Sequence, residues 1–335
     1  MAAKRLPKLP ALLSLKFSKT GQTRGADDDV IYQNRVNRSN TVLIPYENWE
    51  ACAEPKDGTA RYEKGFIVLL SPSEYFGNPK ITEELAAKGL ILGTNALVSF
   101  ETREEWDANN PEPLGWSVAT KRNAPLGGNY VARVPARTTK DKAKAKKIIS
   151  GFHKTKPKGA GIRVFEYASK ATIAKCRLQL EALFWLCVDS DKVVVSNGMK
   201  AEDAATRKAA ILGHCKEDGL LDAEILSKVR ILDAQQNTIC PLCLEELSGQ
   251  EFFNRMEQAE GRDVPDLTVT QVNLFHIQEL KTGILNHRPY NVGWGHHHCN
   301  VVVKDSGILK TLVWMRDVVE RNKAGGHFPA ENKAS

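Results

Sequence analysis

Short runs of β-branched and aromatic residues, set off by Gly, Pro and Asn, dominate the chain between residues 41 and 135. This pattern is typical of strands. It predicts five of them, at residues 41–45, 66–70, 96–102, 116–120 and 130–134. A helical pattern over residues 82–88 interrupts the series. We therefore expect a mixed, β-rich sheet domain over residues 41–135, after a basic arm over residues 1–40.

The pattern becomes helical in the middle of the chain. Residues 168–188 are apolar on more than one face, which predicts a helix buried in the core. Two further helices are expected at residues 201–214 and 222–235, with a break near Gly219. Together they make a helical region over residues 168–236.

A last helix is predicted over residues 306–322, because apolar residues recur there at helical spacing. They are Ile308, Leu309, Leu312, Val313, Met315, Val318 and Val319. Ser306 is a suitable N-cap residue. We interpret the stripe as core packing and not as a surface for a partner. Residues 323–335 form a polar tail.

Length and composition narrow the class of protein. The 335 residues suggest two domains, at roughly 150 residues each. The net charge of +7 is a modest basic bias, which by itself supports nucleic-acid binding weakly. No apolar stretch reaches the roughly 20 residues that span a bilayer. Pro7, Pro10 and Lys16 interrupt the apolar core that a signal peptide needs. We expect a cytoplasmic protein with no membrane partner.

Positive charge is concentrated in residues 136–167, which Pro157 and Gly159 mark as a loop or linker. Two interpretations remain open. The segment is a solvated linker, or it contacts the DNA backbone, since each neutralised phosphate releases counterions. The second interpretation gives as candidate DNA-binding residues Lys144, Lys146, Lys147, Lys154, Lys156 and Lys158.

Three of the seven cysteines belong to a pattern of matched gaps. Cys240 and Cys243 form a Cys-x-x-Cys knuckle, and His296 and Cys299 repeat the same gap. Two such pairs make a tetrahedral Cys3His site of the closed, structural kind that zinc prefers. The neighbouring His297 or His298 remains an alternative histidine ligand. A redox Cys-x-x-Cys is the rival interpretation, but the thioredoxin-like strand–helix context is missing.

Further polar residues stand between and beside these two pairs. His276 ends an apolar run, Asn291 lies in a polar loop, and Asn300 directly follows Cys299. In this order, residues 237–305 resemble the HNH, or ββα-metal, nuclease superfamily. The resemblance implies an HNH module over residues 237–322 that a structural zinc ion stabilises. The expected fold is therefore α+β, with an N-terminal mixed sheet domain, a helical middle region and this C-terminal ββα-metal nuclease module.

The resemblance also implies roles for individual residues. Phosphodiester hydrolysis needs a nucleophilic water, a base to deprotonate it, and a cation to stabilise charge on the phosphate. By the resemblance, His276 is the general base and Asn291 pins the loop and orients that base. Asn300 is a ligand of a catalytic Mg²⁺ or Mn²⁺, which an amide oxygen suits. Apart from the resemblance, Arg288 is a candidate phosphate contact, or it simply caps a loop.

One position departs from the family pattern. The family usually has an aspartate directly before the catalytic histidine as a second metal ligand, and this chain has Phe275 there. Three explanations remain open. His276 itself is a ligand, the site is weakened or inactive, or another residue supplies the ligand. The candidates for that residue are Asn273, Glu279, His287 and His298.

An HNH site alone does not select a DNA sequence. The residues before the module, with the sheet domain over residues 41–135, are therefore expected to recognise the DNA. That region has neither a Walker lysine loop nor a methyltransferase motif, so no nucleotide cofactor is expected. The arrangement resembles a stand-alone type II restriction endonuclease, which implies double-stranded DNA as substrate and a homodimer for a palindromic site. A homing-type endonuclease and a non-catalytic zinc module that binds DNA are alternatives.

A modification-dependent endonuclease is a third alternative. Such an enzyme needs an aromatic pocket for a flipped base. The residues that could line it are Trp49, Tyr62, Tyr75, Trp106 and Trp116.

Overall fold

A computed structural model describes residues 6–18, 41–53, 62–152, 161–254, 270–304 and 306–327. The chain divides into two compact units, which are described separately below. Unit 1 comprises Met1–Phe17, Lys175–Leu280 and Arg288–Ser335, and unit 2 comprises Ser18–Ala174 and Lys281–His287. Both units contain helices and strands, which confirms the expected α+β class. Among the described residues, no helix combines the length and apolar character needed to cross a lipid bilayer.

Unit 2 is built on a six-stranded sheet with the order β5-β4-β3-β2-β1-β6. Its strands are β1 (Val42–Pro45), β2 (Phe66–Leu70), β3 (Ala96–Phe100), β4 (Tyr130–Val134), β5 (Ile148–Ser150) and β6 (Ile162–Arg163). Strands β1 to β4 are parallel neighbours in chain order, β6 is parallel to β1, and β5 is antiparallel to β4. Four of the five predicted strands are thereby confirmed.

Both faces of this sheet are covered, which explains why its strands are almost continuously apolar. Successive side chains of a strand point to opposite faces. In β2, Ile67 and Leu69 pack with Phe152 on one face, while Val68 and Leu70 belong to a second core on the other face.

Short helices connect the strands of unit 2. They are η1 (Tyr46–Asn48), α2 (Trp49–Cys52), α3 (Pro72–Phe76), α4 (Ile81–Ala87), α5 (Arg103–Ala108), α6 (Lys142–Ala145) and η2 (Val164–Glu166). α4 confirms the helix predicted at residues 82–88. α3 and α5 were not predicted, although each begins with a capping box, Ser71 with Glu74 and Thr102 with Glu105. That motif is visible in sequence.

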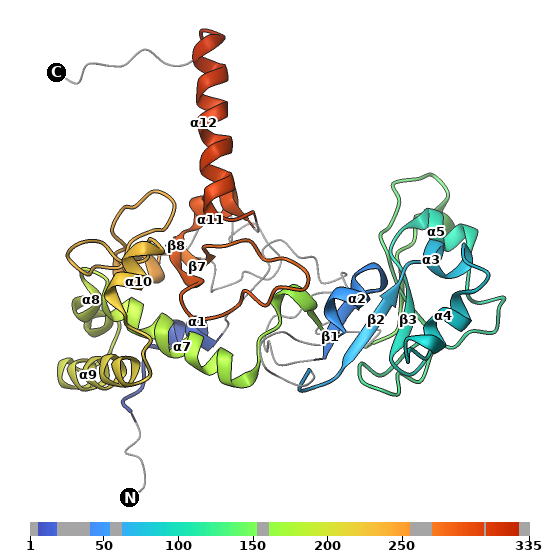
Figure 1. Ribbon diagram of the computed structural model, residues 1–335, viewed down its shortest axis with the longest axis horizontal. Coiled ribbons are helices and arrows are strands. Elements are labelled where there is room, and N and C mark those ends of the chain that lie inside the picture. Colours follow the sequence, from blue (N-terminus) through green and yellow to red (C-terminus); the bar gives the residue numbers. More distant parts are fainter. Residues whose placement is uncertain are drawn as a thin grey trace, which may run out of the picture. The chain divides into compact units, whose positions relative to one another are not determined.

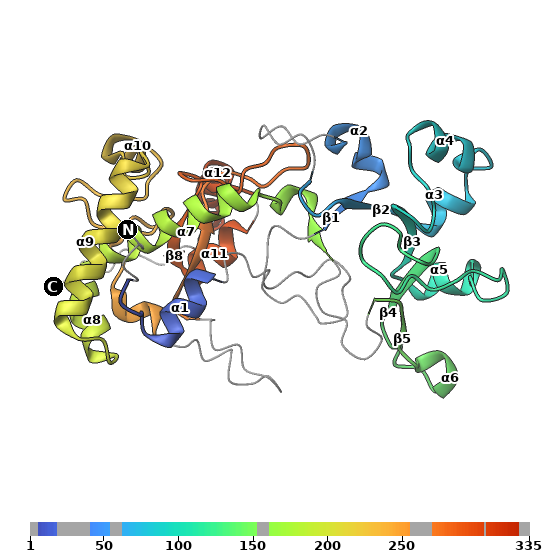
Figure 2. The same ribbon diagram turned by 90° about the horizontal axis from the view of Figure 1, so that it is seen from below.

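Two expectations for unit 2 need correction. Residues 116–120 form no strand: Val118 makes one isolated bridge with Tyr130, because β3 and β5 already pair with β4. The basic segment 136–167 is not a loop throughout, since it contains α6, β5, β6 and η2. Its β5 extends the sheet through pairing with β4, and α6 lies at the tip of the β4–β5 hairpin (Figure 2).

Unit 1 is mainly helical and carries a two-stranded hairpin. Its elements are α1 (Ala11–Ser18), the larger part of α7 (Lys170–Trp185), α8 (Ser190–Ser196), α9 (Ala201–Glu217), α10 (Ala223–Lys228), η3 (Gly249–Phe252), β7 (Val272–His276), β8 (Val292–His296), α11 (His297–Val303) and α12 (Ile308–Ala324). β7 and β8 are antiparallel, and α11 contacts both of them (Figure 1).

The helices predicted at residues 168–188 and 201–214 correspond to α7 and α9. The helix predicted over residues 222–235 is much shorter, because Arg230 has a positive φ of 65° that ends the helical path after α10. α1 and α8 were not predicted. The final helix begins after Gly307 and not after the expected cap Ser306.

Aromatic side chains form the centre of unit 1. The ring of Phe252 lies 5.1 Å from those of Phe184 and Trp294. The indole nitrogen of Trp294 donates a 2.7 Å hydrogen bond to the carbonyl of Leu180 in α7. These contacts fix β8 against α7, and they place the hairpin on a rigid support.

Candidate functional site

The first half of the predicted zinc site is a tight knuckle that follows α10. The amide of Leu244 donates to the carbonyl of Cys240 at 2.9 Å, and Leu244 has a positive φ of 65°. The guanidinium of Arg230 donates to the carbonyl of Pro241 at 2.8 Å. These bonds turn the chain so that Cys240 and Cys243 can reach one metal ion.

The second half of the site lies at the junction of β8 and α11. His296 is the last residue of β8, and Cys299 lies in the first turn of α11. The ligand atoms of Cys240, Cys243, His296 and Cys299 all lie within 4.8 Å of one another. Ligands of a tetrahedral zinc with bonds of about 2.3 Å are about 3.8 Å apart, so this donor set fits such an ion. The structure therefore brings together the four residues that the matched gaps predicted.

The positions of the three histidines favour His296 as the member of the cluster that could hold a metal. Nδ1 of His296 lies 3.3 Å from Sγ of Cys243. The alternative His297 instead has its Nδ1 2.8 Å from the amide nitrogen of Asn273. His298 is exposed, and its ring stacks on that of His296. Neither alternative belongs to the cluster of metal-ligating atoms.

The surroundings of the cluster shift the pKa values of Cys240 and His296 in opposite directions. Burial opposes ionisation of Cys240, but hydrogen bonds from His296 and the knuckle backbone lower the pKa of its thiol to about 6. The bonds to Cys240 and then to Glu251 raise the pKa of His296 to about 11. Burial raises the pKa of Cys299 above its usual range. Binding of a metal would displace protons from these donors.

Glu251 completes the surroundings of His296, and sequence reasoning missed it. Its Oε1 lies 3.4 Å from Nε2 of His296, whereas Sγ of Cys243 lies near the other ring nitrogen, Nδ1. The same carboxylate accepts from the amide of Ser248 in a capping box. The Ser-x-x-Glu spacing could have revealed the cap, but nothing in the sequence indicates the contact with His296.

The predicted general base lies at the end of the hairpin. His276 is the last residue of β7 and pairs with Val292 of β8. It is half-buried. In the antiparallel register, His296 of the Cys3His cluster ends the other strand opposite Val272. The two histidines therefore lie at opposite ends of one antiparallel ladder. The Cys3His cluster lies at the end that carries His296.

Asn291 lies directly before β8 and is 1% exposed. Its side-chain oxygen accepts from the amide of Gln278 at 2.8 Å, and its carbonyl accepts from the amide of Ile277 at 3.0 Å. Both amides belong to the residues that follow His276. Asn291 thus ties the loop before β8 to the chain that leaves the predicted base.

A second tie holds the same loop against α7. Tyr290, at a positive φ of 63°, donates its amide to the side-chain oxygen of Gln179 at 2.9 Å. Gln179 is fully buried and donates to the carbonyl of Leu220 at 2.8 Å. The spacing of polar residues gave no signal for Gln179, because it lies on a long apolar helix.

Asn300, matched to the catalytic metal ligand, lies in α11 and is half-buried. Phe275 stands where the family has an aspartate, and it is fully buried. Its ring lies over Gly295, where an added Cβ would come within 2.5 Å of Cδ2 of Phe275. The side chain at this position therefore packs inward, away from solvent.

The four residues considered as metal ligands in place of the missing aspartate have different surroundings. Asn273 donates to the carbonyl of Thr270 and contacts His297. Glu279 forms a 2.8 Å ion pair with Lys310. His298 is exposed beside the metal cluster. His287 is buried and belongs to unit 2.

The predicted DNA-contacting residues divide between the two units. Lys144, Lys146 and Lys147 are exposed in unit 2, around α6 and the start of β5. Arg288 is exposed in unit 1. Lys154, Lys156 and Lys158 lie outside the described residues.

The five aromatic residues considered for a base pocket are mostly core. Trp49, Tyr62 and Trp106 are buried in unit 2. Tyr75 and Trp116 are half-buried and in edge-to-face contact, with centroids 5.1 Å apart. A pocket built on all five is therefore not formed.

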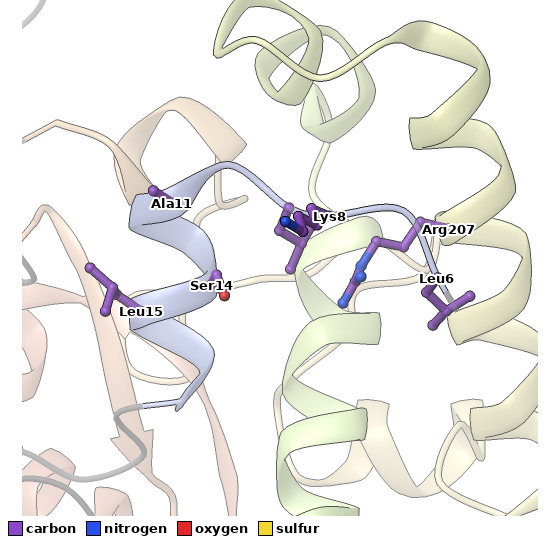
Figure 3. A pocket seen from close by; sticks show the side chains of 7 residues that line it. Leu6, Lys8, Ala11, Ser14, Leu15 and Arg207 are labelled. Atoms are coloured by element: carbon purple, nitrogen blue, oxygen red, sulfur yellow. The ribbon is translucent and has the colours of Figure 1, made fainter. Parts of the chain in front are cut away.

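A separate hollow of about 830 Å³ lies in unit 1 (Figure 3). One side is lined by α1 and the residues that precede it, and the other side by Arg207 of α9. Lys8 and Arg207 are its charged lining residues. The Arg207 guanidinium is already held by the carboxylate of Glu181 and by the carbonyl of Pro7. The hollow therefore offers little free chemistry, and the hairpin remains the candidate site.

Comparison with known proteins gives one family. A sequence model of the BstXI restriction endonuclease family matches residues 15–297. The match includes His276, Asn291 and the first three residues of the metal cluster, and it ends before Cys299 and Asn300. No curated protein matches the chain.

One solved structure, described as the crystal structure of a type II restriction endonuclease, is 13% identical to this chain. The alignment covers 48% of this chain and 58% of that one, with a TM-score of 0.26. This chain thus spans little more than half the length of that protein, and the TM-score is too low to establish a common fold.

Proposed function

Because the chain belongs to the BstXI restriction endonuclease family, we propose that it is a site-specific endonuclease that hydrolyses phosphodiester bonds of double-stranded DNA. We place its cutting site on the hairpin of β7 and β8 with α11, as a one-metal HNH site. The observation that carries this placement is the order of elements. A strand ends in His276, a second strand ends in a metal cluster, and a helix begins there.

Zinc is proposed for the Cys3His cluster, with a structural role. If zinc binds all four protein donors, no position at the ion remains open for a substrate. Cys240 and Cys243 come from the knuckle, whereas His296 and Cys299 come from the β8–α11 junction. A bound ion would therefore join two segments that are far apart in the sequence.

In the proposed reaction, the imidazole of His276 accepts a proton from the attacking water. Asn291 acts on the base indirectly, because its bonds to the amides of Ile277 and Gln278 fix the chain on which His276 sits. Asn300 would hold a Mg²⁺ or Mn²⁺ ion, whose charge stabilises the phosphate and the leaving oxygen. The inward packing of Phe275 means that a second protein ligand must come from another residue.

DNA contacts are proposed for the exposed lysines around α6 and for Arg288. Lysine and arginine neutralise phosphates and thereby position the protein, and base edges carry the sequence information. We further propose a homodimer, because a two-fold pair of sites matches the symmetry of a palindromic target.

A non-catalytic zinc module that binds DNA is the second candidate function. The single observation in its favour is the buried Phe275 in place of a metal-ligating aspartate. DNA binding without cleavage in the presence of either metal would select this candidate.

The test is plasmid cleavage with Mg²⁺ or Mn²⁺. We expect discrete fragments from the wild-type protein and none from His276→Ala. His214→Ala is the matched control, because His214 is exposed on α9 and away from the hairpin; its fragments should be unchanged. Cleavage by His276→Ala at the wild-type rate would contradict the assignment of the base.

A further inference from the structure

Helix α12 is joined to unit 1 by its first turn. Only Ile308 and Thr311 of its seventeen residues are buried. The amide of Ile308 donates to the carbonyl of Ile277 at 3.1 Å, and Lys310 pairs with Glu279 at 2.8 Å. Beyond that turn, the helix extends away from the hairpin and α11 (Figure 1). The predicted core stripe of residues 308–319 is therefore mostly not in a core.

The uncovered part of α12 is rich in large apolar side chains. The exposed fractions are 78% for Leu309, 50% for Val313, 55% for Trp314 and 38% for Met315. The part of α12 that extends beyond its first turn is short enough to be marginal as an isolated helix in water. A half-exposed tryptophan beside other apolar residues is typical of the centre of a protein interface. The helix thus has the composition of a surface that another molecule covers.

The sequence of α12 suggests which molecule that is. The sequence of α12 has the same order of polar and apolar residues in both directions from the peptide bond between Val313 and Trp314. On each side, two apolar residues are followed by two polar residues and then by two apolar residues. The pairs of positions are Val313 with Trp314, Leu312 with Met315, Thr311 with Arg316, Lys310 with Asp317, Leu309 with Val318, and Ile308 with Val319. Every apolar position is matched by an apolar one, and the lysine is matched by an aspartate.

This symmetry coincides with one face of the helix. Lys310, Val313, Trp314 and Asp317 have the spacing i, i+3, i+4 and i+7, which places them on a common face. If a second α12 crosses antiparallel at the junction of Val313 and Trp314, Lys310 of one copy lies opposite Asp317 of the other, and the reverse. The apolar pair fills the centre.

We propose that this face of α12 binds the same face of a second copy of the chain. The contact is isologous, as a two-fold dimer requires. Lys310 and Asp317 can reach a second copy, because their side chains are 65% and 43% exposed. Within the chain, Lys310 pairs with the half-buried Glu279 and Asp317 pairs with the exposed Arg316. This proposal depends on the homodimer proposed above, and it does not depend on the role of His276 as the general base.

Charge exchange tests the pairing by sedimentation velocity over a range of protein concentrations, without DNA. Lys310→Glu should weaken association at least tenfold, since the introduced carboxylate would face Asp317 of the second copy. Adding Asp317→Lys should restore it. Positions 310 and 317 are two helical turns apart, so they cannot compensate each other within one chain. Lys323→Glu, the same charge change near the end of α12, should leave association unchanged.

Trp314→Glu should give a folded monomer, with the far-UV circular dichroism and metal content of the wild type. The proposal is overturned if the wild type is monomeric at all concentrations, or if Trp314→Glu still dimerises. It is also overturned if the double charge exchange does not restore association. Plasmid cleavage is measured separately, so loss of activity in a protein that still dimerises would count against the cutting site alone.

Discussion

Nε2 of His296 lies 3.4 Å from Oε1 of Glu251, while Nδ1 of the same ring lies 3.3 Å from Sγ of Cys243. A ligating histidine is commonly oriented in this way by a carboxylate on its second nitrogen. Glu251 is thereby a positioning residue for the ligand, although the two residues lie far apart in the chain.

Glu251→Ala should weaken zinc binding by about 10- to 100-fold, because the imidazole loses the acceptor that fixes its ring. Competition with a chromophoric chelator measures the effect. Ser248→Ala is the matched control, since it removes the hydroxyl that caps η3 and bonds Asp189, while the Glu251 carboxylate and its bond to the amide of residue 248 remain. Zinc affinity should then stay within a few fold of wild type. Equal losses in both variants would show that zinc binding depends on an intact η3 and not on the carboxylate itself.

Removal of zinc should destabilise unit 1 and leave unit 2 folded. The ion would join the knuckle to the β8–α11 junction. The cysteines of these two segments form no disulfide bond with each other. A loss of about 3 kcal/mol would lower the melting temperature of a unit of this size by roughly 6–12 °C. Calorimetry on protein stripped with a strong chelator checks this, with re-addition of zinc as the control. An unchanged melting curve of a zinc-free sample would contradict a structural role.

Restoring the family aspartate should not improve the site. Phe275 is fully buried over Gly295, so Phe275→Asp removes a core ring and buries a carboxylate. Loss of the ring alone costs about 3–5 kcal/mol. Phe275→Leu, which keeps the position apolar, should cost less. Urea unfolding gives both values. A Phe275→Asp protein as stable as wild type, with faster cleavage, would show that this position does reach the metal.

Asn291→Ala should lower kcat more than its effect on stability suggests. The substitution leaves the amide of Gln278 without its acceptor, at a cost of about 1–3 kcal/mol, and frees the chain that carries His276. Single-turnover cleavage and DNA affinity are the two measurements. We expect a slower chemical step with nearly unchanged affinity. A loss confined to affinity would place Asn291 in DNA binding and not in orientation of the base.

Replacing Lys144, Lys146 and Lys147 together by alanine should weaken DNA binding for all sequences alike. Each lost phosphate contact should reduce the slope of log affinity against log salt by about 1. Fluorescence anisotropy at several salt concentrations measures the slope. Alanine at Lys200, Lys216 and Lys228, which are exposed in unit 1, changes the net charge equally. If both triple variants lower the slope by the same amount, the α6 region is not a specific DNA contact.

Much of the site could be predicted because its signals are local. The matched gaps of Cys240 with Cys243 and of His296 with Cys299 set how far two ligands can reach from one turn, so the pairs were recognisable without a fold. The position of Asn291 before an apolar run identified the loop but not its bonds to Ile277 and Gln278. Gln179 and Glu251 were not predictable, since their roles arise from contacts between distant segments.

The sequence by itself determined most of the strands, the long helices and the four donors of the metal cluster. Those features follow from periodicity, backbone preference and short-range spacing. Only the tertiary structure decided that Phe275 faces the core, that Glu251 meets His296, and that α12 leaves unit 1 after one turn. Periodicity tells which side of a helix is apolar, but what covers that side depends on packing between residues that the chain order does not relate.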